Sequence, residues 1–148
     1  MSDYDLVSPD DAVTWAAYHE IRRRVLFEAR GRYGVYDPHR PDETAPGHFP
    51  RLLLYAGDPI GVVRIDVAGS TAILRRVAIR ADVQRRGHGR MLIALVEQFA
   101  KANRCHECVT HAARDAVEFY RKCGFALADD SSGEMSGNEG VFMRRQLY

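Results

Sequence analysis

The spacing of apolar residues predicts a helix near the start of the chain. Ser8 and Pro9 suggest where it begins, because serine caps helix N-termini and proline suits the first helical position. The apolar stripe consists of Val13, Ala17, Ile21 and Val25. It predicts a buried face that extends to about Phe27. Residues 30 to 50 are rich in Gly, Pro, His and Asp and show weak periodicity. We expect a loop there, with room for a short helix, and its length makes it a candidate binding segment.

Three apolar runs predict an antiparallel meander in the middle of the chain. They cover Leu52 to Ala56, Ile60 to Val67 and Thr71 to Ile79. The intervening segments, Gly57-Asp58-Pro59 and Ala68-Gly69-Ser70, carry residues that favour tight turns. We therefore expect three strands that follow one another directly.

The rest of the chain alternates between helical and strand-like patterns. Met91, Leu92, Leu95, Val96 and Phe99 share one face of a helix that ends near Asn103. We expect a strand over Cys105 to His111, a helix over Ala113 to Lys122 that Gly124 terminates, and strands over Phe125 to Ala128 and Val141 to Leu147. The polar, glycine-rich segment 129–140 is predicted to be a mobile loop. This order predicts a single domain over residues 1–148 with a mixed α/β layered fold.

Composition narrows the class of protein. The 148 residues are 46% hydrophobic and 28% charged, with a net charge of +1, so we expect neither a nucleic-acid partner nor a membrane partner. Arginine dominates the basic residues (19 Arg, 2 Lys), which suits phosphate contacts but also follows from a GC-rich coding sequence. An acidic start without an apolar run and an odd count of three cysteines favour the cytoplasm.

A lone Cys-x-x-Cys motif, Cys105 to Cys108, does not predict a metal site. A structural zinc needs four ligands, and His111 is the only further candidate nearby. Because residues three apart on a strand point to opposite faces, we expect the two sulfurs to diverge. No metal is expected.

The segment Gln84 to Arg90 carries the strongest chemical signal. It joins a predicted strand to a predicted helix and contains Gly87 and Gly89 between arginines. Backbone N–H groups converge in such a turn, the helix N-terminus adds partial positive charge, and glycine lets a ligand approach closely. This combination predicts a phosphate-binding turn.

Three motifs in order point to a known family. Val77-Ala78-Ile79 ends a strand, Gln84-x-x-Gly87-x-Gly89 opens a helix, and Phe119-Tyr120-Arg121-Lys122-Cys123-Gly124-Phe125 ends the last helix. The chain resembles the GNAT acetyltransferases, whose signature is Gln/Arg-x-x-Gly-x-Gly/Ala followed by Phe-Tyr-x-x-x-Gly-Phe. The resemblance covers about residues 52 to 147.

The resemblance implies a mostly antiparallel central sheet flanked by helices, in which two adjacent strands splay apart. It implies acetyl-CoA as co-substrate, with its pyrophosphate on the glycine turn and its pantetheine arm paired with the preceding strand end. The cofactor contacts it implies are Val77, Ala78, Ile79, Gln84, Arg85, Arg86, Gly87, His88, Gly89 and Arg90. From Arg75 to Arg90 six arginines face one aspartate, a local charge of +5 that suits the phosphates of CoA. At Ala113 the chain lacks an asparagine that often touches CoA in the family.

The resemblance also implies catalytic roles. Tyr120 is expected to protonate the departing CoA thiolate, although a purely structural aromatic is the alternative. A backbone N–H near Val77 or Ala78 is expected to stabilise the oxyanion. The family's strand glutamate is absent, because Leu74, Arg75 and Arg76 stand in its place. The general base stays open among Asp66, Glu28, His111 and a water chain.

The expected activity is direct acetyl transfer from acetyl-CoA to a primary amine of a small molecule or peptide. The alternative is a non-catalytic acyl-CoA-binding or regulatory domain. Basic residues between about 20 and 50 would suit an acceptor with a carboxylate or phosphate, but they also fit ordinary surface arginines. Many relatives pair, so a homodimer is one expected state.

Overall fold

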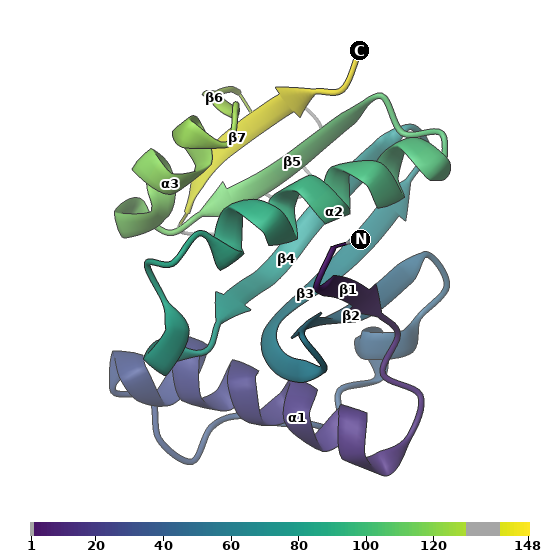
Figure 1. The fold of residues 1–148 in the computed structure, drawn as a ribbon. Helices are drawn as coiled ribbons and strands as arrows, with labels where there is room; N and C mark the ends of the chain where they lie inside the picture. The colour runs from purple at the N-terminus through teal and green to yellow at the C-terminus, as the bar shows by residue number, and fades with distance from the viewer. Residues whose placement is uncertain (1, 130–139) are drawn as a thin grey trace.

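A computed structural model describes residues 2–129 and 140–148, and it contains a seven-stranded mixed sheet (Figure 1). The strands are β1 (Tyr4–Val7), β2 (His48–Tyr55), β3 (Asp58–Ala68), β4 (Thr71–Ile79), β5 (Glu107–Ala112), β6 (Ala126–Leu127) and β7 (Val141–Gln146). Their order in the sheet is β1-β2-β3-β4-β5-β7-β6. Only β4 and β5 pair in parallel, so the predicted mostly antiparallel sheet is confirmed.

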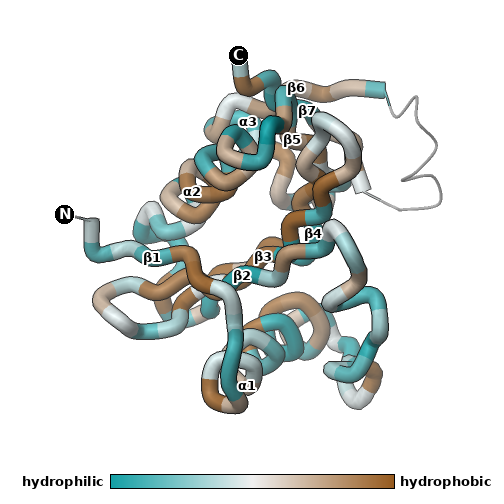
Figure 2. The backbone as a smooth tube through the Cα atoms, turned by 90° about the vertical axis from the view of Figure 1, so that its right-hand side faces the viewer, coloured by the Kyte–Doolittle hydropathy of each residue, from teal (hydrophilic) through white to brown (hydrophobic). Residues whose placement is uncertain are grey.

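Helices cover both faces of this sheet (Figures 1 and 2). The helical segments are α1 (Ala12–Arg22), the π-helical turn η1 (Arg23–Phe27), α2 (His88–Ala102), α3 (Val117–Lys122) and the short 3₁₀ segments η2 (Glu28–Arg30), η3 (Pro41–Thr44), η4 (Ala81–Val83) and η5 (Arg114–Ala116). Side chains alternate along a strand, so Leu52 and Val62 pack on the α1 side while Leu53 and Val63 pack on the α2 side. The result is a three-layer α/β/α arrangement.

The first helix begins later than the sequence predicts. Asp11 is its N-cap: the Asp11 carboxylate accepts a hydrogen bond from the Thr14 backbone N–H at 2.8 Å, and the Thr14 hydroxyl accepts one from the Asp11 backbone N–H at 3.2 Å. This capping box replaces the predicted start at Ser8 and Pro9. Val13 therefore lies in the exposed first turn, with 78% of its surface accessible, and the predicted burial at this position is wrong.

The sheet gains residues that local patterns do not predict. β2 begins at His48 rather than Leu52, although Pro50 lies within it. Along its edge away from β3, β2 pairs with β1 only over Leu52 to Tyr55. Pro50 lies before this paired stretch, so the sheet loses no hydrogen bond although Pro50 has no N–H to donate. β1 itself was not predicted, because four residues carry too little periodicity.

The adjacent strands β4 and β5 diverge at the half of β4 that carries the Val77-Ala78-Ile79 motif. Parallel pairing between β4 and β5 ends at Leu74 and Thr110, and the remaining half of β4 has no partner on that side. On its other side β4 bulges, because Arg76 and Val77 lie opposite the single residue Val63 of β3. Arg76 occupies the left-handed region, with φ of +57°. The predicted splay of two adjacent strands is thereby confirmed.

The remaining boundaries lie close to the predictions. α2 begins at His88, inside the glycine turn, and the predicted helix after β5 splits into η5 and α3. Most of the predicted loop 129–140 lies outside the described residues. No helix in the described part of the chain is long and apolar enough to cross a membrane.

Candidate functional site

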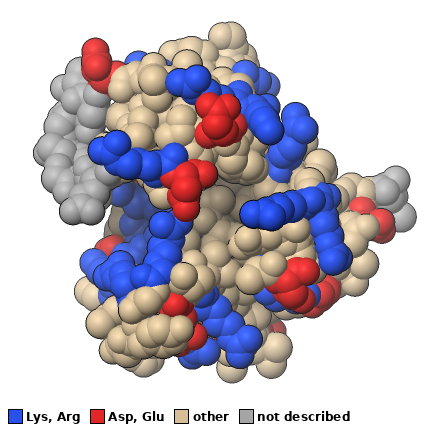
Figure 3. Space-filling view, turned by 90° about the vertical axis from the view of Figure 1, so that its left-hand side faces the viewer, with Lys and Arg blue, Asp and Glu red and all other residues tan. Residues whose placement is uncertain are grey.

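A cavity of about 800 Å³ lies at the splay between β4 and β5. Its floor comes from β3, β4 and β5, and its outer wall comes from η1 and the segment that follows it. The charged and titratable residues that line it are Arg30, Arg32, Asp37, Arg40, Asp42, His48, Arg64, Asp66, Arg75, Arg76, His111 and Tyr120. On the side of the molecule that carries η4 and α3, Lys and Arg side chains surround a hollow (Figure 3).

Tyr120 lies in the wall of this cavity, on α3. Its ring packs edge-on against Phe119 and Phe125, with centroid distances of 5.1 and 5.3 Å, and only 5% of the residue is exposed. Burial raises the pKa of the Tyr120 phenol to about 12, and a hydrogen bond with Thr110 lowers it in part. The phenol therefore keeps its proton at any physiological pH. A protonated tyrosine, whose ring is packed against two phenylalanines, therefore lines the cavity.

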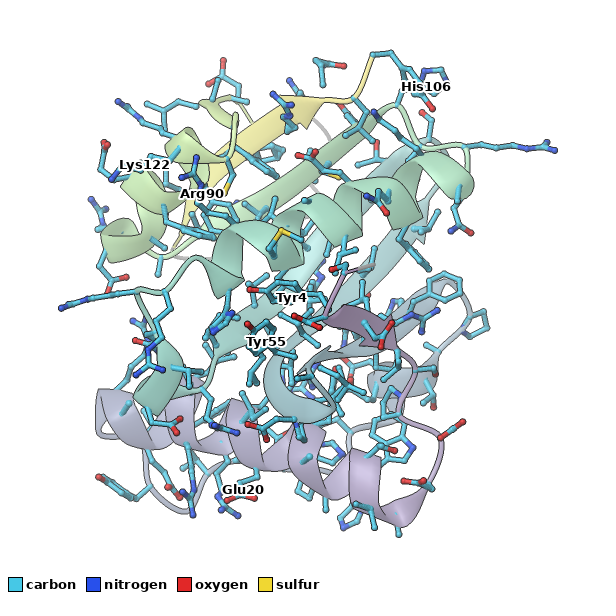
Figure 4. All side chains as sticks on the ribbon, viewed as in Figure 1. Tyr4, Glu20, Tyr55, Arg90, His106 and Lys122 are labelled. Atoms are coloured by element: carbon cyan, nitrogen blue, oxygen red, sulfur yellow. The ribbon has the colours of Figure 1, made fainter. Side chains whose placement is uncertain are left out.

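The glycine turn has the backbone that an anion-binding turn needs. Gly87 has φ of +87°, and a Cβ built on it would meet no atom within 4 Å, so its outer side is open. α2 runs for 15 residues from this turn, so its N-terminal dipole points at the opening. Arg85, Arg86 and Arg90 are exposed around the turn, and Arg90 lies toward α3 (Figure 4).

Not every arginine of the basic segment is available to a ligand. Arg80 is held by Asp58 at 3.1 Å and by Asp82 at 2.6 Å, and these two carboxylates raise its pKa. Arg75 donates to Asp66 at 3.0 Å. Within the described residues, Arg85, Arg86 and Arg90 form no ion pair. The charge that a phosphate would meet at the turn is therefore smaller than the +5 counted along the sequence.

Two side chains of the predicted cofactor set point elsewhere. His88 is buried against β1 and β2: its Nδ1 lies 2.7 Å from the Tyr4 hydroxyl, and its ring lies 5.0 Å from that of Tyr55 (Figure 4). The Gln84 side-chain amide donates to the Ile79 carbonyl at 2.8 Å. Both contacts anchor the turn, so only the backbone of His88 is left to face a ligand.

The end of β4 presents backbone polar groups to the splay. Arg80 N–H donates to Ile60 of β3 at 2.7 Å, and backbone groups alternate sides along a strand. The N–H and C=O of Ile79 therefore face away from β3, toward the splay, where the Gln84 side-chain amide already binds the carbonyl. Val77 lines the cavity, whereas Ala78 is buried. An extended chain could pair with this open edge as an added strand.

Of the carboxylates proposed as general base, neither is free in the cavity. Asp66 is 6% exposed, and Arg64 holds both of its oxygens, at 2.8 and 2.9 Å. Arg75 also donates to Asp66, so charge-assisted hydrogen bonds from two arginines engage this carboxylate. Glu28 pairs with Arg23 at 3.3 Å and does not line the cavity. Neither carboxylate is therefore placed to contact a substrate without first giving up its arginine partners.

Two imidazoles line the cavity instead. His111 ends β5 there, as predicted. His48 was not predicted: its register opposite Asp66 arises only when β2 pairs with β3, and no local pattern signals it. The His48 Nδ1 contacts the Asp42 carbonyl, which can only accept, so in the neutral ring Nε2 carries the lone pair. That nitrogen lies 3.6 Å from Asp66 Oδ2.

A buried ion pair holds the outer wall in place. Arg22 on α1 donates to Glu43 of η3 at 2.5 Å, and the Tyr18 hydroxyl donates to the other carboxylate oxygen at 2.5 Å. Arg22 and Glu43 are 1% and 7% exposed. The segment between α1 and η3 contributes most of the outer wall. These bonds attach its C-terminal end, at Glu43, to α1.

The cysteines do not form a functional site. Cys105 and Cys108 are fully buried in the same apolar cluster, so the prediction that they diverge is wrong. The reason is that Cys105 precedes β5 and does not follow strand alternation. Burial raises the pKa of Cys108 to about 12 and makes it a weak nucleophile. In the described ranges, no three His, Cys, Asp or Glu side chains are grouped so as to hold a metal.

Comparison with known proteins agrees with this geometry. The sequence model described as "Acetyltransferase (GNAT) family" matches residues 15–125. The "Putative acetyltransferase BSU40680" of Bacillus subtilis (strain 168) is 27% identical over 128 residues, covering 86% of each chain. A GNAT-family acetyltransferase from Staphylococcus aureus Mu50 superposes with a TM-score of 0.80 at 12% identity, covering 98% of this chain and 99% of that one. PaiA N-acetyltransferase from Thermoplasma acidophilum, solved with coenzyme A, has a TM-score of 0.74 at 15% identity and covers 99% of both chains.

Proposed function

The chain belongs to the GNAT family of acetyltransferases, and on this premise we propose that it transfers an acetyl group from acetyl-CoA directly to a primary amine. The observation that carries the proposal is the continuity of one path. The open glycine turn leads along the unpaired edge of β4 to a cavity that holds a buried, protonated tyrosine. A long donor with phosphates at one end and a thioester at the other suits this path.

The donor would bind by its phosphates at the turn. Backbone N–H groups from Arg85 to Arg90 and the α2 N-terminus would hold the pyrophosphate, and the three unpaired arginines would supply positive charge. The pantetheine arm would pair with Val77 and Ile79. The thioester carbonyl would then lie near the bulge, where the backbone N–H of Val77 would stabilise the oxyanion. The N–H of Ala78 is excluded from this role because Ala78, like Arg80, directs its backbone groups toward β3.

The amine attacks the thioester carbon, and the tetrahedral intermediate collapses with loss of the CoA thiolate. Tyr120 would donate a hydrogen bond, and finally a proton, to that sulfur. The amine must lose a proton, and His48 or His111 would take it, directly or through water. Replacing each histidine with glutamine would distinguish them. Only replacement of the histidine that accepts the proton should change the acidic limb of the pH–rate profile.

A non-catalytic acyl-CoA-binding domain is the alternative, and the engagement of Asp66 by two arginines favours it to a degree. One experiment separates the two functions. Purified protein is titrated with CoA while its melting temperature is followed, and it is then incubated with acetyl-CoA and a panel of primary amines. Stabilisation with turnover supports the enzyme, stabilisation without turnover supports the binding domain, and no stabilisation contradicts both.

A further inference from the structure

The charges that line the cavity are unbalanced. Six arginines face three aspartates, and most of these groups satisfy one another. Arg64 and Arg75 hold Asp66, and Arg64 also reaches Asp42 at 3.1 Å, where Arg40 is a second partner at 3.4 Å. Positive charge is left over after this pairing.

Among the cavity arginines, Arg32 and Arg76 have no counter-ion in the described residues; the Arg32 guanidinium lies over the Phe27 ring, and Arg76 has no such contact. Arg76 is half-buried, lines the cavity, and forms no hydrogen bond or ion pair with any residue that the structure describes. Burial lowers its pKa, and the nearby cations Arg22, Arg40 and Arg64 lower it further, while Glu43, which is already paired with Arg22, raises it in part. An isolated guanidinium in such surroundings is costly to bury unless a ligand supplies the opposite charge.

The backbone holds Arg76 in this unfavourable place. It is the first residue of the β4 bulge, and its φ of +57° is rare for a side chain other than glycine, asparagine or aspartate. Strained positions of this kind gather at ligand sites. The bulge also sets Arg76 immediately before Val77, the residue nearest the expected thioester.

We propose that the acceptor is a short amine that also carries an anionic oxygen group, a carboxylate or a phosphate, and that Arg76 binds this group. The inference rests on the proposed acetyl transfer and specifies its second substrate. A planar guanidinium can accept either group through two parallel N–H···O bonds. Because Arg76 adjoins the reacting end of β4, binding there would direct the amine of a short molecule toward the thioester. A polyamine would meet net positive charge instead.

Matched pairs of amines test this proposal. The rate of thiol release from acetyl-CoA is measured with 4-aminobutyrate against butylamine, with phosphoethanolamine against ethanolamine, and with 1,4-diaminobutane. We expect kcat/KM for at least one anionic amine to exceed that of its neutral partner by about tenfold or more, as for hydrogen bonds to a charged group. The preferred pair identifies the group as carboxylate or phosphate.

Variants assign the preference to one residue. Arg76→Gln should raise KM for the anionic amine about tenfold and so remove most of its advantage over the neutral amine, and Arg76→Lys should restore part of the preference. Arg24→Gln is the matched control, because that side chain is 66% exposed and pairs with Glu20 away from the cavity. It should keep the full preference.

The outcomes separate the inference from the proposed function. Turnover with equal efficiency for anionic and neutral amines, or with a preference for diaminobutane, overturns the inference and leaves the acetyltransferase intact. If no amine turns over, the proposed function fails, and calorimetry with butyrate and with ethyl phosphate in the presence of CoA decides the anion site. Binding that Arg76→Gln abolishes supports the site, and the absence of binding refutes it.

Discussion

Replacing Tyr120 with phenylalanine removes one hydroxyl from the cavity and leaves the ring packed between Phe119 and Phe125. The phenol has a pKa of about 12, so handing its proton to a thiolate with an ordinary pKa near 8.5 is uphill by about 5 kcal/mol. The phenol must therefore act first as a hydrogen-bond donor to the developing charge. Such a bond to a charged group contributes about 1.5–3 kcal/mol. We expect Tyr120→Phe to lower kcat by about 10- to 150-fold.

The assay is thiol release from acetyl-CoA at saturating amine, measured from pH 6 to pH 10. Because burial holds the pKa of Tyr120 near 12, the phenol stays protonated over this whole range. Deprotonation of Tyr120 should then cause no loss of wild-type activity at alkaline pH. The rate of Tyr120→Phe should be lower than the wild-type rate by the same factor at every pH.

A matched control is Tyr148→Phe, since Tyr148 is 80% exposed at the end of the chain. It should retain wild-type kcat. The reasoning is refuted if Tyr120→Phe keeps wild-type kcat, or if its loss of rate is matched by a large fall in melting temperature, because Tyr120 would then be a structural aromatic.

Three further changes test other parts of the account. Gly87→Ala should cost about 1–2 kcal/mol of stability and weaken CoA binding in a thermal-shift titration, whereas Gly57→Ala, with a φ of +84° and equally open surroundings, should cost as much and leave CoA binding unchanged. Glu43→Leu should lower the free energy of unfolding by about 3–5 kcal/mol because it strands the buried Arg22 guanidinium; adding Arg22→Met should recover most of the loss in denaturant melts. Tyr4→Phe removes the hydrogen bond to the first residue of α2, so it should raise KM for acetyl-CoA without changing kcat; an unchanged KM would show that this contact does not position the turn.

Local patterns were enough to predict the elements that carry the sequence-contiguous parts of the candidate site. The glycine turn, the strand Thr71–Ile79 and Tyr120 each depend on neighbours within a few residues, and the structure has them in the expected elements. The meander was also predictable, because Gly and Pro mark its turns.

Features that depend on long-range pairing could not be predicted. The register of His48 against Asp66 exists only once β2 and β3 pair. The contact between Arg22 and Glu43 joins residues 21 positions apart. The bulge at Arg76 arises because two residues of β4 lie opposite one residue of β3, and no glycine in the sequence indicates it. These three features lie on the proposed acceptor side, so local sequence patterns say less about the acceptor than about the proposed donor.

Direct detection of the product tests the central claim most closely. Purified protein is incubated with acetyl-CoA labelled in the acetyl group and with the amine panel, and mass spectrometry follows the label while a thiol reagent follows CoA. The account predicts that label appears on one amine in step with free CoA, and that Tyr120→Phe slows both equally. CoA release without labelled amine, or CoA binding with neither product, would contradict acetyl transfer.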